Sequence, residues 1–244
     1  MESQSLFQVR EHGGINPETE SPRLVAKHLS AYHFAKDFAR GRTLEIGCGD
    51  GYGSSLLSNT AEEVIGIDLF ERNVEVASAK YDRPNLKFLR MNATELAFPE
   101  KSFDLAVSFQ VIEHIPQALL NQYLNEIKRV LKINGVACIS TLNLKKNLKA
   151  GQTYDKSPHH DKEFLPFEFE DLLKSHFRQV AVYGLYPTSK HLFFERLKKA
   201  GFGKMPAPLN PVARFYDHIT ARDFYWSRQN NLDDCIDLLA VCRN

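Results

Sequence analysis

Short apolar runs alternate with amphipathic stretches through the first 141 residues of the chain. The runs that we predict to be buried strands cover residues 44–46, 64–68, 86–91, 103–109 and 136–141. Between them, apolar residues recur at spacings of three and four, as on one face of a helix. Because strands that alternate with helices pair in parallel, the pattern predicts a parallel sheet with helices on both faces.

The segments around this repeating part have a different character. Residues 1–20 are polar, and they form either a disordered tail or an arm that folds over the site. A helix is predicted from Ser21 to Gly41, with Ser21 as its N-cap and Pro22 in its first position.

The alternation of predicted strands and helices ends after Thr141. Residues 142–163 form a long polar loop, and such loops in a compact domain are usually functional or disordered. After a predicted helix and a sixth strand, residues 186–232 look like an insertion with a basic amphipathic helix and a strongly aromatic segment. The apolar run 235–242 suits a last strand, although periodicity alone also allows a helix.

The most informative segment is 43–53, Thr-Leu-Glu-Ile-Gly-Cys-Gly-Asp-Gly-Tyr-Gly. Its four glycines follow a predicted strand at alternate positions, which gives a tight turn without β-carbons. A ligand can then lie on the backbone at the start of the next helix. A dinucleotide fingerprint needs a small residue where Tyr52 stands, so the spacing argues against a nicotinamide dinucleotide. The plainer alternative is a flexible glycine-rich loop.

Polar residues end the second and third predicted strands. Asp68 lies about twenty residues beyond the first glycines, where its carboxylate can accept hydrogen bonds from a ribose diol. The alternative role for Asp68 is a helix N-cap. Asn92, followed by the small Ala93, either hydrogen-bonds an adenine edge or forms a plain Asx turn.

Composition and charge narrow the class of protein. Thirty-one basic and thirty acidic residues nearly cancel, so no overall positive field points to nucleic acid or an anionic membrane. No apolar run has the length of a membrane span, and the N-terminus lacks the features of a signal peptide. The four scattered cysteines fit buried thiols in a reducing compartment. We therefore expect a cytoplasmic protein.

Three histidines are candidates for a general base. His159 and His160 lie in the polar loop after the fifth strand, on the predicted ligand side, although solvated histidines are common in such loops. His114, beside Glu113, is a further candidate whose alternative role is a packed imidazole at a helix start. We expect no metal site, because no ligand spacing is recognisable apart from the adjacent His159-His160-Asp161.

These motifs together resemble those of the class I S-adenosylmethionine (SAM) dependent methyltransferases. The similar segments are Glu45-x-Gly-x-Gly-x-Gly51, Gly66-Ile-Asp68, Asn92 to Pro99 with Ser102-Phe-Asp104, Val111 to Ile115, and Arg129 to Gly135. The groups that the chain resembles most are the ubiquinone/menaquinone-biosynthesis type and bacterial methyltransferases found with glycan-assembly enzymes. Asn92 and Gln110 depart from the residues that are commoner at those positions.

The resemblance implies a fold and a set of cofactor contacts. The fold is an α/β, Rossmann-like, doubly wound sheet of seven strands, mostly parallel, with the last strand antiparallel. Glycines 47, 49 and 51 would then line the methionine and ribose of SAM, and Asp68 would hold the ribose hydroxyls. The remaining residues expected to bind the cofactor are Glu45, Leu69, Asn92, Ala93, Phe109 and Gln110.

The chain is thus expected to be a single methyltransferase domain. Residues 1–40 would be an N-terminal arm and helix, 41–141 the SAM-binding core, and 142–165 and 186–232 insertions on the acceptor side. By analogy with the family, the acceptor would be a hydroxyl oxygen of a small molecule, saccharide or glycan precursor. An NAD-dependent dehydrogenase and a non-catalytic SAM-binding protein are the alternatives, and the aromatic insertion would be an acceptor lid or a homodimer surface.

Overall fold

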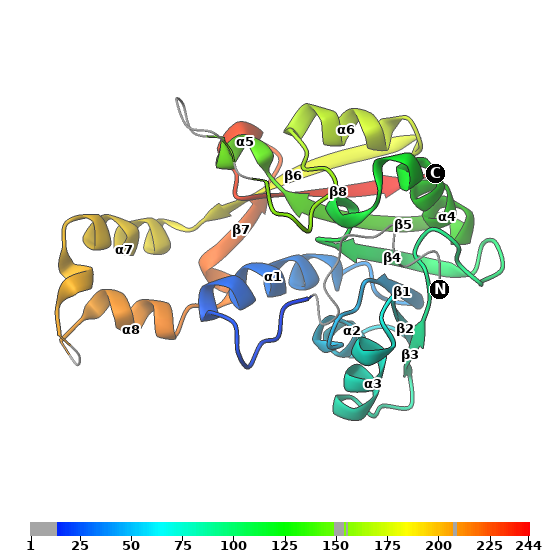
Figure 1. Cartoon of the computed structure of the whole chain (residues 1–244), viewed down its shortest axis with the longest axis horizontal. Coiled ribbons are helices and arrows are strands. Elements are labelled where there is room, and N and C mark those ends of the chain that lie inside the picture. Colours follow the sequence, from blue (N-terminus) through cyan, green and yellow to red (C-terminus); the bar gives the residue numbers. More distant parts are fainter. Residues whose placement is uncertain (1–13, 149–153, 155, 207–208) are drawn as a thin grey trace.

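The computed structural model describes residues 14–148, 154, 156–206 and 209–244. Within these residues, eight strands form one sheet in the order β3-β2-β1-β4-β5-β8-β6-β7 (Figure 1). The strands are β1 (Arg42–Ile46), β2 (Glu63–Asp68), β3 (Leu86–Arg90), β4 (Phe103–Phe109), β5 (Leu131–Leu142), β6 (Gln179–Pro187), β7 (Phe224–Ser227) and β8 (Asp237–Arg243).

The longer helices lie between these strands. They are α1 (Pro22–Ala35), α2 (Tyr52–Leu57), α3 (Glu71–Lys80), α4 (Leu120–Val130), α6 (Pro166–Lys174), α7 (Ser189–Lys199) and α8 (Pro211–Asp217). Shorter ones include α5 (Leu144–Asn147), η2 (Ile112–His114), η3 (Gln117–Leu119) and η4 (Phe202–Lys204). As predicted, Ser21 caps α1, its side chain accepting a hydrogen bond from the Leu24 amide. The expected tail or arm falls partly on residues 1–13, which lie outside the described residues.

The parallel half of the sheet has a switch in strand order that places the site. Strands β1 to β5 pair in parallel, and β1 lies between β2 and β4, so that Glu45 is opposite Gly66 on one side and Val107 on the other. The chain order runs outward from this point in opposite directions, through β2 to β3 on one side of β1 and through β4 to β5 on the other. A crevice therefore opens at the carboxyl ends of β1 and β4, which is where doubly wound sheets bind ligands.

The C-terminal run is a strand, as its composition suggested. β8 inserts between β5 and β6 and is antiparallel to both. The predicted count of seven strands is too low by one, because part of the aromatic insertion forms β7. Trp226 of β7 lies opposite Leu185 of β6, so this segment extends the sheet edge in addition to any other role.

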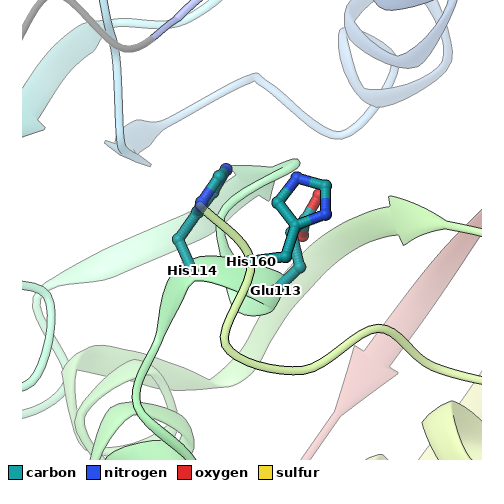
Figure 2. A group of neighbouring side chains, drawn as sticks. All are labelled: Glu113, His114 and His160. Atoms are coloured by element: carbon teal, nitrogen blue, oxygen red, sulfur yellow. The ribbon is translucent and has the colours of Figure 1, made fainter. Parts of the chain in front are cut away.

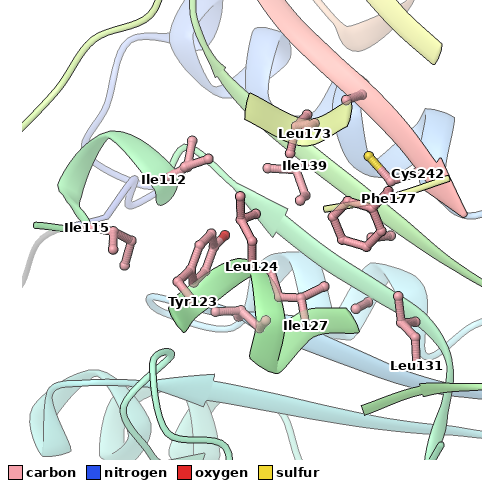
Figure 3. Close-up of a cluster of buried hydrophobic side chains, with 14 of the residues drawn as sticks. Ile112, Ile115, Tyr123, Leu124, Ile127, Leu131, Ile139, Leu173, Phe177 and Cys242 are labelled. Atoms are coloured by element: carbon pink, nitrogen blue, oxygen red, sulfur yellow. The ribbon is translucent and has the colours of Figure 1, made fainter. Parts of the chain in front are cut away.

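Two apolar layers cover the sheet. On one face, α4 and α6 pack side chains such as Tyr123, Ile127 and Leu173 against the sheet (Figure 3). On the other face, α1, α2 and α3 contribute Tyr32 and Leu57 to a second cluster. These layers are the helix-covered faces that the alternating pattern predicts.

The insertion between β6 and β7 forms a helical arm. Helices α7 and α8 project beyond the end of the sheet (Figure 1). A small apolar cluster at the base of the arm joins Phe215 and Phe224 to Ala26 of α1. None of the helices in the described ranges combines the length and apolar character that crossing a membrane requires.

Candidate active site

A cavity of about 730 Å³ lies at the carboxyl ends of β1, β2 and β4. Its size is that of a site for a cofactor-sized ligand. Predicted site residues that line it are Gly47, Gly49, Asp68, Leu69, Asn92, Ala93, Phe109, Gln110, His114, His159 and His160. Residues from five separate segments of the sequence thus meet at one edge of the sheet.

The glycine loop forms the floor of the cavity beside β1. Gly47, Gly49 and Gly51 all have a positive φ, of 75°, 53° and 88°, a conformation that a side chain disfavours. A β-carbon on Gly49 would meet only Gly14 Cα, at 3.9 Å, so that this backbone is open to a ligand. These backbone conformations and the open space at Gly49 support the predicted role of the loop as a surface for a ligand, and they argue against a merely flexible loop.

Asp68 already has hydrogen bonds with three protein donors. Its Oδ1 accepts from the Phe70 amide and from Asn73 Nδ2, both at 3.0 Å, and its Oδ2 accepts from the Gly49 amide at 2.9 Å. These are the three donors that the described residues place in hydrogen-bond geometry, and a carboxylate has about four acceptor positions, which leaves one for a ribose hydroxyl. Asp68 therefore also stabilises the turn before α3, and it couples that turn to the glycine loop.

Asn92 forms the Asx turn that was one of its two predicted roles. Its carbonyl oxygen accepts from the Thr94 amide at 3.0 Å and from the Thr94 hydroxyl at 2.9 Å, which is an Asx turn. That arrangement leaves the amide nitrogen as the group able to donate to a base edge. Beside it, Ala93 offers only a methyl group to the cavity.

Gln110 lies at the end of β4 in a conformation that is uncommon for a residue with a side chain. Its φ is 57°, and its amide donates to the Ser140 carbonyl at 3.0 Å on the neighbouring strand. This bond fixes the backbone where Phe109 and Gln110 enter the cavity. Uncommon backbone of this kind is frequent at functional sites.

Two of the predicted cofactor residues lie away from the cavity. The Glu45 carboxylate is buried and accepts hydrogen bonds from the hydroxyls of Tyr32, at 2.6 Å, and Ser54. Gly51 faces the side chains of Ala77 and Phe88, which leave no space for a β-carbon. Both residues shape the loop from behind, since one holds α1 and α2 together and the other allows α3 to pack closely.

The opposite wall of the cavity carries Glu113, His114 and His160 (Figure 2). His160 comes from the loop after β5, which is held against η2 by bonds from the Asp161 and Lys162 amides to the Glu113 carbonyl, at 2.7 and 3.3 Å. The His114 and His160 rings meet edge to face with centroids 4.9 Å apart. This docking of a distant loop creates the wall.

Hydrogen bonds at Nδ1 determine which nitrogen of each ring carries the proton. His114 Nδ1 lies 2.7 Å from the His159 carbonyl, and His160 Nδ1 lies 2.5 Å from Glu163 Oε1. A carbonyl and a carboxylate only accept, so each Nδ1 is the donor and each Nε2 of a neutral ring keeps its lone pair. Burial lowers the pKa of His160 to about 4 and also lowers the pKa of His114, which keeps both rings neutral near pH 7.

The same cluster has the ligand types of a metal site. One carboxylate oxygen of Glu113 and one ring nitrogen from each of His114 and His160 lie within 4.8 Å of one another. Two imidazoles and a carboxylate suit a divalent transition metal. Sequence spacing indicated no such group, because His160 is far from the other two residues along the chain.

Several cavity residues were not predicted. Lys27 of α1 lies 3.1 Å from an oxygen of Asp237, at the start of β8, and both line the cavity. Gly14, Ile15 and Glu20 bring the N-terminal segment to the same rim, in keeping with the predicted arm. No local motif marks Lys27 or Asp237, since their contact depends on how α1 crosses the sheet.

Comparison with known proteins agrees with this arrangement. Residues 44–139 match the model of a methyltransferase domain. The chain is 31% identical over 214 residues to a protein of Mycobacterium tuberculosis named as a probable S-adenosylmethionine-dependent methyltransferase, covering 81% of this chain and 75% of that protein. It is 36% identical over 151 residues to a protein of Mycolicibacterium smegmatis with a similar name, covering 61% of this chain and 56% of that protein.

More distant matches extend the comparison. A ubiquinone biosynthesis O-methyltransferase of Pelagibacter ubique is 32% identical over 110 residues, which are 45% of this chain and 44% of that protein. The structure of a SAM-dependent methyltransferase of Thermotoga maritima, titled as a possible histamine N-methyltransferase, superposes with a TM-score of 0.60. It covers 89% of each chain at 17% identity, which is a likeness of fold alone.

Proposed function

Because the chain belongs to the class I SAM-dependent methyltransferases, we propose that it methylates a hydroxyl oxygen of a small or medium-sized acceptor, of the saccharide or glycan-precursor type. The observation that carries the proposal is the single cavity with two unlike walls. One wall is the glycine loop with Asp68, and the other holds two neutral imidazoles. The likeness to ubiquinone O-methyltransferases supports oxygen as the target atom.

The donor wall has a group for each part of the cofactor. The open backbone at Gly49 would bear the methionine and ribose, and the remaining acceptor position of Asp68 would take a ribose hydroxyl. The Asn92 amide nitrogen would face the adenine edge. Gln110 would lie under the sulfonium, where its backbone is fixed by Ser140. When bound, SAM supplies an electrophilic methyl group, so the protein contributes alignment and exclusion of water.

The acceptor wall would provide the base. A sugar hydroxyl is a poor nucleophile near neutral pH and gains about 10²–10⁴-fold from a positioned base. We assign this role to His160 Nε2, with His114 beside it as a hydrogen-bond partner for the acceptor. When the acceptor oxygen takes the methyl group, the sulfur–carbon bond of the sulfonium would break to leave S-adenosylhomocysteine, and His160 Nε2 would take the acceptor proton. His159 acts through its carbonyl, which orients His114.

Glu163 would be the positioning residue for this base. Its carboxylate holds His160 Nδ1 at 2.5 Å, with a side chain that is only 2% exposed. A negative charge there stabilises the imidazolium that forms when Nε2 takes the proton. Burial raises the pKa of Glu163. When His160 gains a proton, its positive charge favours the ionised carboxylate of Glu163 and so opposes that rise.

Ligand binding tests the proposal first. Isothermal titration of the purified chain with S-adenosylhomocysteine, SAM and NAD should give binding for the first two and none for NAD. Binding of NAD alone would overturn the proposal in favour of a dehydrogenase. Methyl transfer from labelled SAM should then be measured against matched sets of sugars, phenols and amines. Turnover of amines but not hydroxyl compounds would refute the oxygen acceptor, and tight SAM binding without any turnover would favour a binding protein.

A further inference from the structure

The helical arm formed by residues 189–217 carries two kinds of exposed side chain. Large apolar groups are exposed along it, namely Leu192, Phe193, Phe202, Met205 and Leu209, with exposed fractions from 37% to 70%. Among the described residues these are five of the ten large apolar side chains that are exposed. Half of the exposed apolar side chains of this kind are therefore gathered on one projecting element.

The arm also holds the excess positive charge of the chain. Residues 189–217 contain six basic side chains, Lys190, Arg196, Lys198, Lys199, Lys204 and Arg214, and two acidic ones, Glu195 and Asp217. Their net charge of +4 compares with +1 for the whole chain, so the remainder is −3. The nearly neutral total that argued against an anionic membrane thus hides a strongly basic segment.

The inner side of the arm is already used for packing. Phe194 stacks on Phe215 with ring centroids 4.2 Å apart, and the buried His191 lies among aromatic rings that include Phe224 at 4.9 Å. Glu195 accepts a hydrogen bond from the Tyr216 hydroxyl. These contacts hold α7 on α8.

The outer side mixes apolar and basic groups in helical register. Leu192, Arg196 and Lys199 are spaced by four and three residues, so they share the face of α7 that also includes the exposed Phe193. Within the part of the chain that the structure describes, no carboxylate forms an ion pair with Arg196, Lys199, Lys204 or Arg214. Their charge is therefore available to a partner.

We propose that this arm is a docking surface for an anionic lipid bilayer. Cations next to exposed aromatic and aliphatic groups are the pattern of interfacial membrane helices, in which the apolar groups enter the acyl boundary and the cations meet lipid phosphates. Phe193 and Leu209 enter the bilayer, and Arg196, Lys199 and Lys204 hold the headgroups. The inference concerns a surface separate from the cavity, and it does not depend on the acceptor.

Vesicle binding by the full chain tests this surface. The protein should float or sediment with vesicles of phosphatidylcholine mixed with phosphatidylglycerol, and not with phosphatidylcholine alone. Phe193→Ser with Leu209→Ser should abolish the association, and Lys199→Glu with Lys204→Glu should weaken it about tenfold or more. Raised salt should weaken it as well.

Matched variants elsewhere on the surface distinguish vesicle binding by the arm from non-specific adsorption to lipid. Phe167→Ser on α6, where the side chain is 61% exposed, and Lys87→Glu on β3 should bind vesicles like the unmodified protein. Unchanged binding of S-adenosylhomocysteine would show that the arm variants are folded. Equal binding to both kinds of vesicle, or binding to neither, would overturn the proposal. So would a dimer in solution that Phe193→Ser dissociates, because the face would then join two copies of the chain.

Discussion

His160 and Glu163 form a short, partly buried hydrogen bond, with Nδ1 2.5 Å from Oε1, on a loop that docks beside His114. The bond leaves Nε2 of His160 as the free lone pair at the acceptor wall. The bond thus connects His160, which would contact the acceptor, with Glu163, which would not. The two residues should therefore differ in how strongly their loss affects turnover.

Replacing the base should lower turnover without affecting the donor site. His160→Gln is expected to reduce kcat by about 10²–10⁴-fold, and Glu163→Gln by a smaller factor, about tenfold to hundredfold. The dissociation constant of S-adenosylhomocysteine and the melting temperature should change little. His176→Gln is the matched control, because His176 lies just beyond the C-terminal end of α6 and does not line the cavity. A normal kcat in His160→Gln would rule out the assigned base.

Gly49 in the loop and Gly53 in the first turn of α2 should separate binding from folding. Gly49→Ala puts a methyl group into the ligand space and costs only about 1–2 kcal/mol for its positive φ. It should weaken S-adenosylhomocysteine at least about tenfold, with a small loss of melting temperature. Gly53→Ala places Cβ 2.1 Å from the Tyr32 ring and should mainly lower the melting temperature. Full binding by Gly49→Ala would contradict the role of the loop as a surface for a ligand.

Asp68 should contribute to both cofactor affinity and loop order. Asp68→Asn keeps the size of the side chain but turns one acceptor into a donor facing an amide donor such as that of Gly49 or Phe70. We expect affinity for S-adenosylhomocysteine to fall about ten- to hundredfold, measured by titration calorimetry. Asp50→Asn in the same loop should have much less effect, because Asp50 pairs with Lys80 and does not line the cavity. Equal losses in both variants would argue against a ribose contact.

Glu45 should make stability depend on pH. Burial raises the pKa of Glu45 to about 7, and nearby Asp68 adds to this rise, so the folded protein binds a proton that the unfolded chain releases near its ordinary value of 4.5. The stability contribution of the protonated group is therefore complete below about pH 4.5 and is lost as the pH rises through 7. Glu45→Gln should show a smaller fall in melting temperature between pH 5 and pH 8. An unchanged pH dependence would mean that Glu45 stays ionised.

Zinc should inhibit the enzyme by occupying the acceptor wall. Zn²⁺ bound to Glu113, His114 and His160 would take the lone pairs that proton transfer needs. Activity should fall with added Zn²⁺ and return with EDTA, and His160→Ala should lose zinc binding measured by competition with a chromogenic chelator. His218→Ala, on the exposed end of α8, should bind zinc normally. If EDTA instead abolished activity and a metal restored it, the cluster would be a cofactor site and the base assignment would be wrong.

Much of the cofactor half of this protein is determined by the sequence alone. Strands, the glycine loop and Asp68 follow one another within about twenty-five residues, and each is specified by local pattern: apolar runs, residues that tolerate positive φ, and a polar group at a strand end. Parallel pairing then brings the strand ends together, so the positions of Gly49, Asp68 and Asn92 could be inferred. The composition of the run 235–242 suggested a last strand, whereas its antiparallel direction was implied only by the resemblance to the methyltransferases.

Only the tertiary structure decided the rest. In the structure, Glu45 and Gly51 lie behind the glycine loop and away from the cavity. Lys27 pairs with Asp237, and β7 extends the sheet. His160 lies beside His114, with Glu163 behind it. These relationships join segments that lie far apart or in irregular loops, where no periodicity sets direction. Their geometry comes from how loops and helices pack on the sheet, and that packing depends on contacts across the whole chain, which local spacing does not encode.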